Sequence, residues 1–299
     1  MKMQRHKSNM AGFMSAEVSL CIIVAIMLSG CADEQDAFIK NAWQDYSVTA
    51  SVVSVDVTTR MADSNSQTVF QTGDTIVVSV PGGTVSSYRY VYTGTGNVFR
   101  PATGNYGLWK KMAETTSAVT VGAWYGGSGF VPAAGATVTA SADQSTMSKF
   151  LKNIYMSAVT AVDDPVVCKN LNFAFSHLMA CLNISVTISD AGVAGKDVMG
   201  AGAVLVNVKN TAVLNTDTGK GYKLVTGSGN VNLKMRSEWN EQNPYKINFK
   251  CLLPPQTLPS GQKIELTLGN GKSYVCTLND GATVLTAGYV TTLPVNILP

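Results

Sequence analysis

The chain has 299 residues, which is enough for one large domain or two of ordinary size. Hydrophobic residues form 45% of it and charged residues 14%, so it can build cores, is not of the disordered class, and must have a surface of Ser, Thr, Asn and Gly more than of Lys and Glu. The net charge is +3, and Lys2, Arg5 and Lys7 against Glu17 supply most of it, so no basic field is left to attract nucleic acid.

The N-terminal stretch predicts a signal peptide over residues 1–30. The segment Met1–Ser19 is mildly basic, and Leu20–Leu28 is a run of nine apolar residues. A membrane-spanning helix needs about 20 residues, so this run is too short to be one. It fits the apolar region of a signal peptide.

The sequence LSGC, which ends at Cys31, resembles the lipobox of bacterial lipoproteins, in which the cysteine thiol carries the lipid. We therefore expect Cys31 to be lipidated. Acyl chains such as palmitate, at about 0.8 kcal/mol per buried CH₂, would hold the precursor on the outer membrane. The acidic Asp33, Glu34 and Asp36 resemble the export tag of lipoproteins that pass to the cell surface. A solvated tether and, for the whole stretch, an ordinary secretory signal are the alternatives.

Beyond Cys31 the sequence predicts an all-β protein. Helix signals are confined to Asp36–Trp43 and to Asp143–Ile154, which could cap and start a short helix. Elsewhere apolar residues alternate at a period of two between clusters of Gly, Asn, Asp, Ser and Pro, as in Val53–Val57 and Ile76–Val80. Short strands spaced by about 8–12 residues indicate β-sandwiches or barrels. No helix alternates with them as a parallel βαβ sheet would require.

The segment Leu171–Ile188 is the longest apolar strand candidate. Its inward-facing residues are odd-numbered in the first half and even-numbered in the second, and a bulge or bend between His177 and Cys181 would reconcile the two. The stretch Ala161–Pro165 before it is the candidate domain boundary. We therefore place two β-domains at residues 61–165 and 166–299.

The segment Ile264–Leu278 predicts a β-hairpin. The apolar residues of both arms are even-numbered, so a two-residue Asn270-Gly271 loop would set them on opposite faces. A three-residue loop, Gly269–Gly271, sets them on one face, with Gly271 at positive φ in a bulge. We prefer the three-residue loop because a slip of one residue would expose half of the apolar side chains.

The sequence of the mature chain shows no acid/base pair and no activated nucleophile of the kind that an active site needs. It is therefore predicted not to be an enzyme and to need no cofactor. Its one histidine, His177, lies in an apolar run and is expected to be structural. Ser260–Lys263 matches the S-x-x-K motif but falls in a turn before a strand.

Four cysteines follow Cys31, and their spacing contains no C-x-x-C, which argues against a zinc or redox site. They are Cys168, Cys181, Cys251 and Cys276. An even number in an exported protein allows two disulfides in three pairings. Buried free thiols are the alternative, above all for Cys276, which lies among inward-facing residues.

Two groups of aromatic residues could either bind a sugar or fill a core. Tyr88, Tyr90 and Tyr92 share one strand face, and Trp124-Tyr125 precedes a Gly pair, so both groups could stack on sugar rings. The same residues would fill a core without any ligand, which is the interpretation we favour for the tyrosines.

Four short segments together resemble the fimbrillin family, the subunits of lipoprotein-derived (type V) pili of Gram-negative anaerobes. They are Phe70–Ile76 with the pattern F-x-x-G-D-x-I, Asn172–Val186 with F-x-H-x-M-A-x-L, Leu253–Thr257 around P-Q, and Leu285–Tyr289 with G-x-Y-like character at the opening of the last strand. Their order and spacing agree over essentially the whole mature chain. The resemblance implies two transthyretin-like, immunoglobulin-like β-sandwich domains.

The resemblance also implies a structural subunit of a cell-surface pilus, or fimbrium, that serves cell adhesion. In the family, an extracellular arginine-specific or trypsin-like protease removes the N-terminal strand of the lipidated precursor. A C-terminal strand of another pilus subunit then fills the open groove by donor-strand exchange. Here Val48–Val57 would be the removable strand, so residues 31–60 form the acidic tether and that strand. Arg60 is the only arginine between Arg5 and Arg89, which predicts cleavage after Arg60, with an ordinary exposed loop arginine as the alternative.

The segment 284–298 is the candidate donor strand. Pro294 cannot donate a hydrogen bond, which suits an edge position. The sequence ends at Pro299 directly after this strand, so if the strand completes its own domain, none is left to donate. The alternative is then a pilus tip or accessory adhesin, or a surface lipoprotein, that binds glycan or host protein without polymerising. The residues of the candidate donor face are Leu285, Ala287, Tyr289, Thr291, Leu293, Val295 and Ile297.

Overall fold

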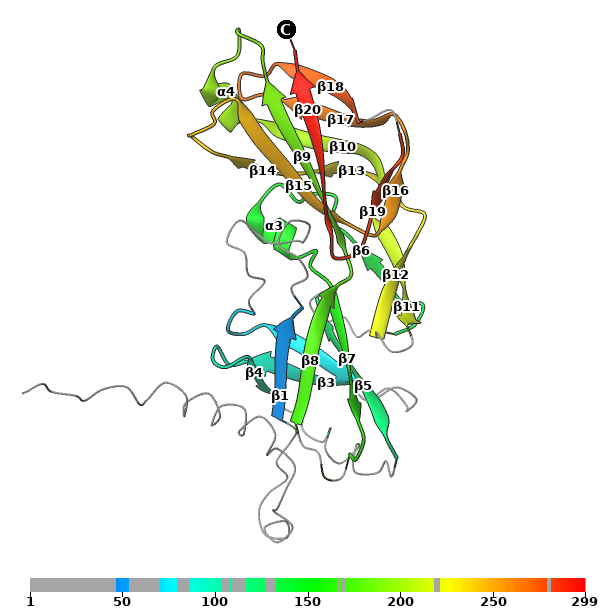
Figure 1. The fold of residues 1–299 in the computed structure, drawn as a ribbon. Coiled ribbons are helices and arrows are strands. Elements are labelled where there is room, and N and C mark those ends of the chain that lie inside the picture. Colours follow the sequence, from blue (N-terminus) through cyan, green and yellow to red (C-terminus); the bar gives the residue numbers. More distant parts are fainter. Residues whose placement is uncertain are drawn as a thin grey trace, which may run out of the picture. The chain divides into compact units, whose positions relative to one another are not determined.

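The computed structural model describes residues 47–53, 70–79, 87–103, 108, 117–126, 133–165, 167, 170–217, 221–278 and 281–298. Over these ranges the chain is a succession of β-strands joined by turns, with the short helices α3 (Met147–Leu151) and α4 (Gly195–Met199) (Figure 1). The predicted all-β class is confirmed. The number of domains stays a prediction.

One sheet closes on itself. Its neighbours pair antiparallel, except that β1 and β8 run parallel and thereby close the sheet. Alternate side chains of these strands fill the interior, and Tyr90, Phe99, Phe173 and Phe175 are among its largest fully buried residues. In spatial order the strands are β1 (Ser47–Val52), β4 (Val98–Pro101), β3 (Ser87–Tyr92), β2 (Thr75–Ser79), β5 (Val119–Tyr125), β7 (Met156–Val162) and β8 (Asn170–His177).

The apolar segment Leu171–Ile188 leaves this sheet at its midpoint. It forms β8 and then β9 (Ala180–Ile188), which belongs to a different sheet. The buried residues are odd-numbered in β8 and even-numbered from Leu182 onward in β9, and the change falls at Leu178 and Met179, so the predicted bend is confirmed. The boundary expected near residue 165 lies between β7 and β8, which are both strands of the closed sheet.

Two four-stranded sheets share a single core. Phe249 and Leu182 from one sheet and Leu205 and Ile264 from the other are at most 1% exposed within it. The first sheet has the order β14 (Arg236–Trp239), β15 (Lys246–Leu253), β9 and β20 (Val290–Ile297). The second has the order β13 (Asn230–Lys234), β10 (Gly202–Lys209), β17 (Gln262–Thr267) and β18 (Ser273–Leu278).

Smaller sheets complete the described strands. β12 (Gly221–Thr226), β11 (Thr211–Asp217) and β6 (Thr137–Thr139) form one, and β16 (Gln256–Leu258) pairs with β19 (Thr283–Leu285) in the other. A third cluster of buried residues joins β5 of the closed sheet to β6 and β11 through Trp124, Val138 and Leu214.

The predicted β-hairpin is confirmed, including its loop. β17 and β18 pair Ile264 with Cys276 and Leu266 with Tyr274, and the Leu268 N–H donates to the Lys272 carbonyl at 2.8 Å. Three residues therefore remain in the loop, and Gly271 has φ of 86°, which only glycine adopts without strain.

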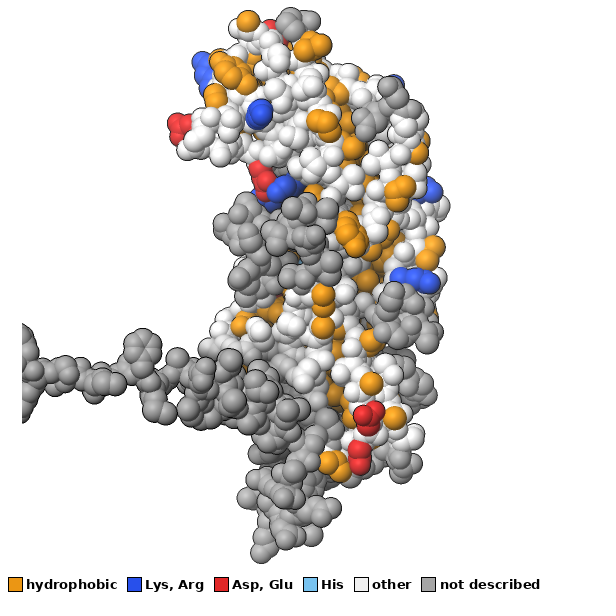
Figure 2. All heavy atoms as spheres, viewed as in Figure 1, with side chains coloured by type: hydrophobic (Ala, Val, Ile, Leu, Met, Phe, Trp, Pro, Cys, Tyr) orange, Lys and Arg blue, Asp and Glu red, His pale blue; other side chains and the backbone are white. Residues whose placement is uncertain are grey.

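The surface is poor in charge, as the composition predicts. Figure 2 shows a face on which uncharged polar and backbone atoms predominate and charged side chains are scattered. One half-buried ion-pair group binds Glu238 of β14 to Arg236 and to Lys250 of β15, each at 2.6 Å. The Arg236 guanidinium also lies 5.3 Å from the centre of the Phe150 ring, so this group links α3 to the neighbouring sheet.

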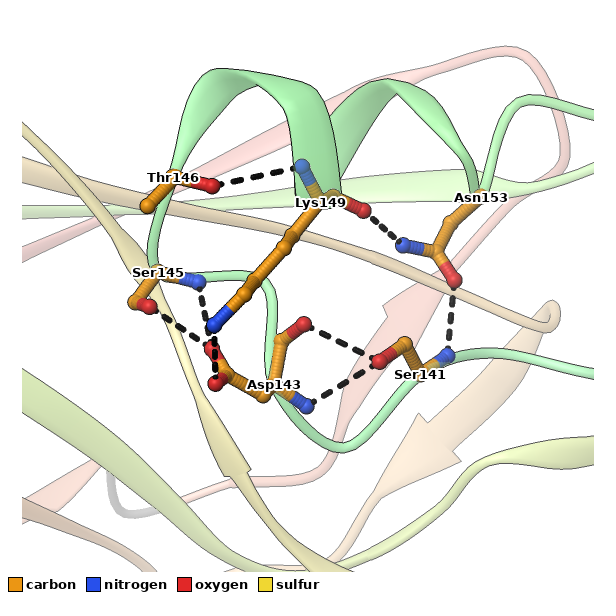
Figure 3. Close-up of polar contacts among 6 residues, drawn as sticks. All are labelled: Ser141, Asp143, Ser145, Thr146, Lys149 and Asn153. Atoms are coloured by element: carbon orange, nitrogen blue, oxygen red, sulfur yellow. Dashed lines mark hydrogen bonds and ion pairs between the residues drawn. The ribbon is translucent and has the colours of Figure 1, made fainter.

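The helix predicted within Asp143–Ile154 is α3. Thr146 caps it, since its hydroxyl accepts a hydrogen bond from the Lys149 N–H at 3.3 Å (Figure 3). The Asp143 carboxylate accepts from the Lys149 ammonium at 2.6 Å and from the Ser145 N–H at 3.0 Å. These contacts, together with the hydrogen bond that the Ser145 hydroxyl donates at 2.6 Å, hold the pKa of Asp143 below its usual range.

The loop that leads into α3 is anchored by buried amides. The Asn153 side chain accepts from the Ser141 N–H and donates to the Lys149 carbonyl, both at 2.7 Å (Figure 3). Gln144 is fully buried, and its side chain donates to the Leu252 carbonyl at 2.9 Å and accepts from the Leu252 N–H at 2.8 Å. The loop is thus bound to β15 through the buried backbone groups of Leu252.

Replacing Gln144 by Met should lower the free energy of unfolding by about 2–4 kcal/mol, because a buried backbone group left unpaired costs about 1–3 kcal/mol. The side chain keeps its length, so the loss reports the two hydrogen bonds to Leu252 together with the one that the amide donates to the Ser141 carbonyl. Urea unfolding of the variant measures it. Gln242→Met, the same exchange at an exposed position, should change stability by less than about 0.5 kcal/mol.

Candidate functional site

Strand β1 lies between β4 and β8 and is held mainly by its backbone (Figure 1). Its register with β8 runs from Ser47↔Asn170 to Val52↔Phe175, in parallel, and its register with β4 pairs Val48 with Phe99. The Val53 N–H donates to the Phe175 carbonyl at 2.9 Å, which extends this ladder beyond the strand. β1 is therefore the strand that closes the sheet.

The side chains that β1 buries are small. Val48 is 0% and Ala50 2% exposed, and Val52 packs against the same core while only partly buried. They stand against large residues such as Phe99 and Phe173. Without β1, the edges of β4 and β8 would lack their partner, and apolar spaces at alternate positions would open to solvent. Such a site can accept another extended strand.

The structure forms a strand over the first part of the expected segment Val48–Val57. The alternation expected at Val53, Val55 and Val57 falls beyond β1: the buried residues of the strand are the even-numbered Val48 and Ala50, Val53 is 36% exposed, and Val55 and Val57 lie outside the described residues. Ala50 is a weak hydrophobic signal, and β1 ends at Val52. Thr49 and Ser51 alternate with Val48, Ala50 and Val52. This alternation of polar and apolar residues could have indicated the buried face.

The F-x-x-G-D-x-I segment contributes its phenylalanine to the core of this sheet. Phe70 packs its ring on Phe99 and Phe175, with ring centres 5.0 and 5.7 Å apart, and is 6% exposed. Gly73 has φ of 96° in the turn that follows, and the Asp74 carboxylate accepts from the Gln71 N–H at 2.7 Å. This segment therefore serves the core that β1 completes.

The centre of the Tyr125 ring lies 5.5 Å from that of Phe70. Burial raises the pKa of Tyr125 well above its usual value, and the negative charge of Asp74 and a hydrogen bond to that carboxylate raise it further. Tyr125 is partly buried and packs against the core of the closed sheet as a neutral phenol.

The candidate donor segment 284–298 forms two strands of its own chain. Leu285 lies in β19, paired with β16, and β20 runs parallel to β9 from Val290↔Cys181 to Ile297↔Ile188 (Figure 1). The turn between them contains Gly288 at φ of 76°, and Gly288 donates to the Met179 carbonyl at 2.9 Å. The segment is thus interrupted where a single long strand was expected.

Its predicted inward residues fall into two groups. Leu285, Leu293, Val295 and Ile297 are between 1% and 9% exposed and belong to the core of the two four-stranded sheets. Ala287 and Thr291 are half-buried, and Tyr289 is 43% exposed. Pro294 lies on β20, an edge strand.

Three of the four candidate disulfide cysteines are described, and all three are free thiols. Cys181 pairs with Leu252 and Cys251 with Leu182 across β9 and β15, so the two thiols lie on opposite faces of that sheet. Burial raises the pKa of Cys181 to about 12 and that of Cys251 well above its usual value. These buried thiols are unreactive core residues.

The aromatic candidates for sugar stacking are mostly core residues. Trp124 is 1% exposed, and its indole N–H donates to the Gly126 carbonyl at 2.9 Å. Tyr90 is 0% and Tyr92 7% exposed inside the closed sheet. The preferred interpretation of the tyrosines as core residues agrees with this placement, and Trp124 offers no ring face to a ligand.

The remaining predicted site residues, Cys31, Arg60 and Cys168, lie outside the described residues. No helix in the part of the chain that the structure describes is long and apolar enough to cross a membrane. Across the described ranges, no three His, Cys, Asp or Glu side chains are grouped so as to hold a metal ion.

Comparison with known proteins identifies the fold. The model of a family described as fimbrillin-like matches residues 59–299. The chain belongs to the fimbrillin-like family. Membership associates it with fimbriae, and so with the cell surface. A comparison with curated proteins returned no match.

Solved structures share the architecture at low sequence identity. A candidate cell adhesion protein from Bacteroides ovatus is 18% identical with a TM-score of 0.60, over 86% of this chain and 93% of that one. A candidate cell adhesion protein from Bacteroides uniformis is also 18% identical, with a TM-score of 0.57 over 84% and 92% of the two chains. At this identity the likeness establishes the fold.

Proposed function

We propose that this member of the fimbrillin-like family is a fimbrial subunit that accepts a strand from another subunit in place of β1. Its precursor is lipidated at Cys31, reaches the cell surface, and is cut after Arg60 by an extracellular arginine-specific or trypsin-like protease. The observation that carries the proposal is the position of β1, which closes a sheet while burying only small side chains.

The order along the chain supports this role. Arg60 follows β1 in the sequence, so a cut there would leave β1 bound to the rest of the protein by non-covalent contacts alone. An incoming strand could then form the same ladder on β8 and place larger apolar side chains against Phe173 and Phe99. That difference in buried apolar area would favour exchange, at about 25 cal/mol per Å².

The position of β20 supports a second candidate, a terminal or accessory subunit. To donate segment 284–298, the chain would have to separate β20 from β9 and expose Leu293, Val295 and Ile297. A subunit that accepts a strand without donating one would end a fibre at one pole. Such a subunit is also placed to bind a glycan or host protein in adhesion.

Treatment of the full chain with an arginine-specific protease tests the proposal. Cleavage after Arg60 should release the N-terminal fragment, and the remainder should then bind a synthetic peptide of residues 284–298. Native gels and mass spectrometry report both steps. Arg60→Lys keeps the charge but removes the cleavage site, so this variant should retain β1 and not bind the peptide.

The products distinguish the two candidates. Ladders of denaturation-resistant oligomers after cleavage would indicate a subunit that both donates and accepts. A cleaved monomer that takes up the added peptide would indicate a terminal subunit. A cleaved monomer that binds no peptide would contradict strand acceptance in both forms.

A further inference from the structure

Strand β18 is an edge strand of its sheet. Its pairing with β17 shows which of its backbone N–H and C=O groups point away from the sheet. The Leu268–Lys272 hydrogen bond makes the pairs Leu266↔Tyr274 and Ile264↔Cys276 the hydrogen-bonded ones, since such pairs alternate in an antiparallel ladder. The odd-numbered residues of β18 therefore direct their N–H and C=O groups away from β17. No hydrogen bond to the backbone of these residues, Ser273, Val275 and Thr277, occurs among the described residues.

The other long edges of the described open sheets carry features that hinder strand addition. β20 has Pro294, whose nitrogen cannot donate, and β14 carries the charged Arg236 and Glu238. Both backbone groups of Lys234 in β13 are bonded by the loop before α3, and β12 contains Lys223. The strands β6, β16 and β19 have three residues each.

β18 has none of these features. Its sequence, SYVCTL, is six residues long and contains no charge and no proline. Val275 is 66% exposed on its outer face, with Ser273 and Thr277 exposed on either side. The nearest charge in the sequence, the Lys272 ammonium, is bound to Asp190 of its own chain. An uncharged edge with an exposed apolar centre favours pairing with another strand.

A groove accompanies this edge. It has a volume of about 400 Å³ and lies between β18 and β20, along residues 274–278 and 294–297. These are the adjacent edges of the two four-stranded sheets. A strand added to β18 would cover the groove with its inward side chains.

We infer that β18 pairs with β18 of a second copy of this chain, antiparallel about a two-fold axis through Val275. This arrangement sets Val275 opposite itself and Ser273 opposite Thr277 of the other copy. All three pairs are of the hydrogen-bonded kind, because the same odd-numbered residues point outward in both copies. The β13-β10-β17-β18 sheet of one copy thereby continues into the same sheet of the other copy.

The outer face of the joined sheet supports a second copy as the occupant. Glu265 lies beside Val275, and Lys263 beside Thr277, within each chain. About the two-fold axis, the Glu265 side chains are separated by the two valines, and each Lys263 lies in a row with the partner's Ser273 and Thr267. No like charges stand directly opposite, so the edge is complementary to itself. This pairing uses neither β1 nor Arg60 and is independent of strand exchange.

Sedimentation of the full chain in detergent over a wide range of concentration tests the inference. The chain should form dimers, and Val275→Lys should abolish them because two ammonium groups would meet at the axis. Val284→Lys, which introduces the same charge at a valine 64% exposed on β19, should leave the dimer intact. Equal melting temperatures of the two variants would establish that both fold.

A cross-linking experiment locates the axis. Hydrogen-bonded antiparallel pairs have Cα atoms about 5.5 Å apart, within the range of a disulfide. Val275→Cys should therefore give a covalent dimer on mild oxidation, and Val284→Cys should give none above the wild-type level. A wild-type chain that stays monomeric, a Val275→Lys dimer as strong as wild type, or equal cross-linking of the two cysteine variants would overturn the inference. So would a monomer whose β18 captures an extended peptide of another subunit.

Discussion

Replacing Val48 by Asp is expected to release β1 from the closed sheet. The side chain at this position is 0% exposed and packs among aromatic residues, where no described cation could pair with a carboxylate. A buried unpaired charge should cost about 4 kcal/mol or more. Besides its backbone bonds, β1 is held by the small side chains of Ala50 and Val52 and by the hydrogen bond that the Thr49 hydroxyl donates to Asn172, so the chain should relieve this cost by detaching the strand.

Hydrogen exchange measures the detachment. Amides of β8 and β4 that face β1 should lose protection, while those of β10 and β15 in the other core should keep it. Ser51→Asp places the same charge on the exposed face of the same strand and should leave protection unchanged. Equal protection of β8 in the two variants would show that β1 does not close the sheet.

The Val48→Asp variant also examines strand acceptance without a protease. If the space left by β1 accepts a strand, this variant should bind the peptide of residues 284–298 with Arg60 uncut, and Ser51→Asp should not. If neither variant binds the peptide although β8 loses protection in Val48→Asp, then β1 can be released without the chain accepting another strand.

Truncation of Trp124 to Ala should produce the second large effect, a loss of about 3–5 kcal/mol in the free energy of unfolding. The indole is 1% exposed, and its ring centre lies 5.8 Å from that of Tyr155 and 5.9 Å from that of Tyr222. The substitution removes these contacts and leaves the Gly126 carbonyl without its donor.

Urea unfolding gives the magnitude, and Tyr245→Ala, at an aromatic residue 49% exposed, should change stability far less. A glycan-binding role for Trp124 makes the opposite prediction, namely lost binding with stability unchanged. A Trp124→Ala chain as stable as wild type would therefore contradict the core assignment.

Patterns local in the sequence predicted the structure well. The parity of Ile264, Leu266 and Leu268 against Tyr274, Cys276 and Leu278 determined both the hairpin and its three-residue loop. A parity change also located the bend at Leu178 and Met179, because a strand cannot move its apolar residues to the other face without an irregularity.

Long-range pairing could not be predicted in the same way. The parallel partners of β1 and β20 lie far away in the chain, and a parallel pair leaves no turn signal between its strands. Gln144 has the appearance of a loop residue in the sequence, yet it is fully buried because it bonds Leu252, more than a hundred residues later. Contacts of this kind depend on the assembled fold.

The parallel pairing of β20 with β9 also determines how the chain would bear tension. A pull on the C-terminal end of β20 acts along the strand axis, so the pairs from Val290↔Cys181 to Ile297↔Ile188 carry the load together in shear. β9 continues through Met179 and Leu178 into β8, so the load passes along one covalent backbone to the strand that holds β1. In a fibre exposed to flow, this backbone would be the mechanical axis of the subunit.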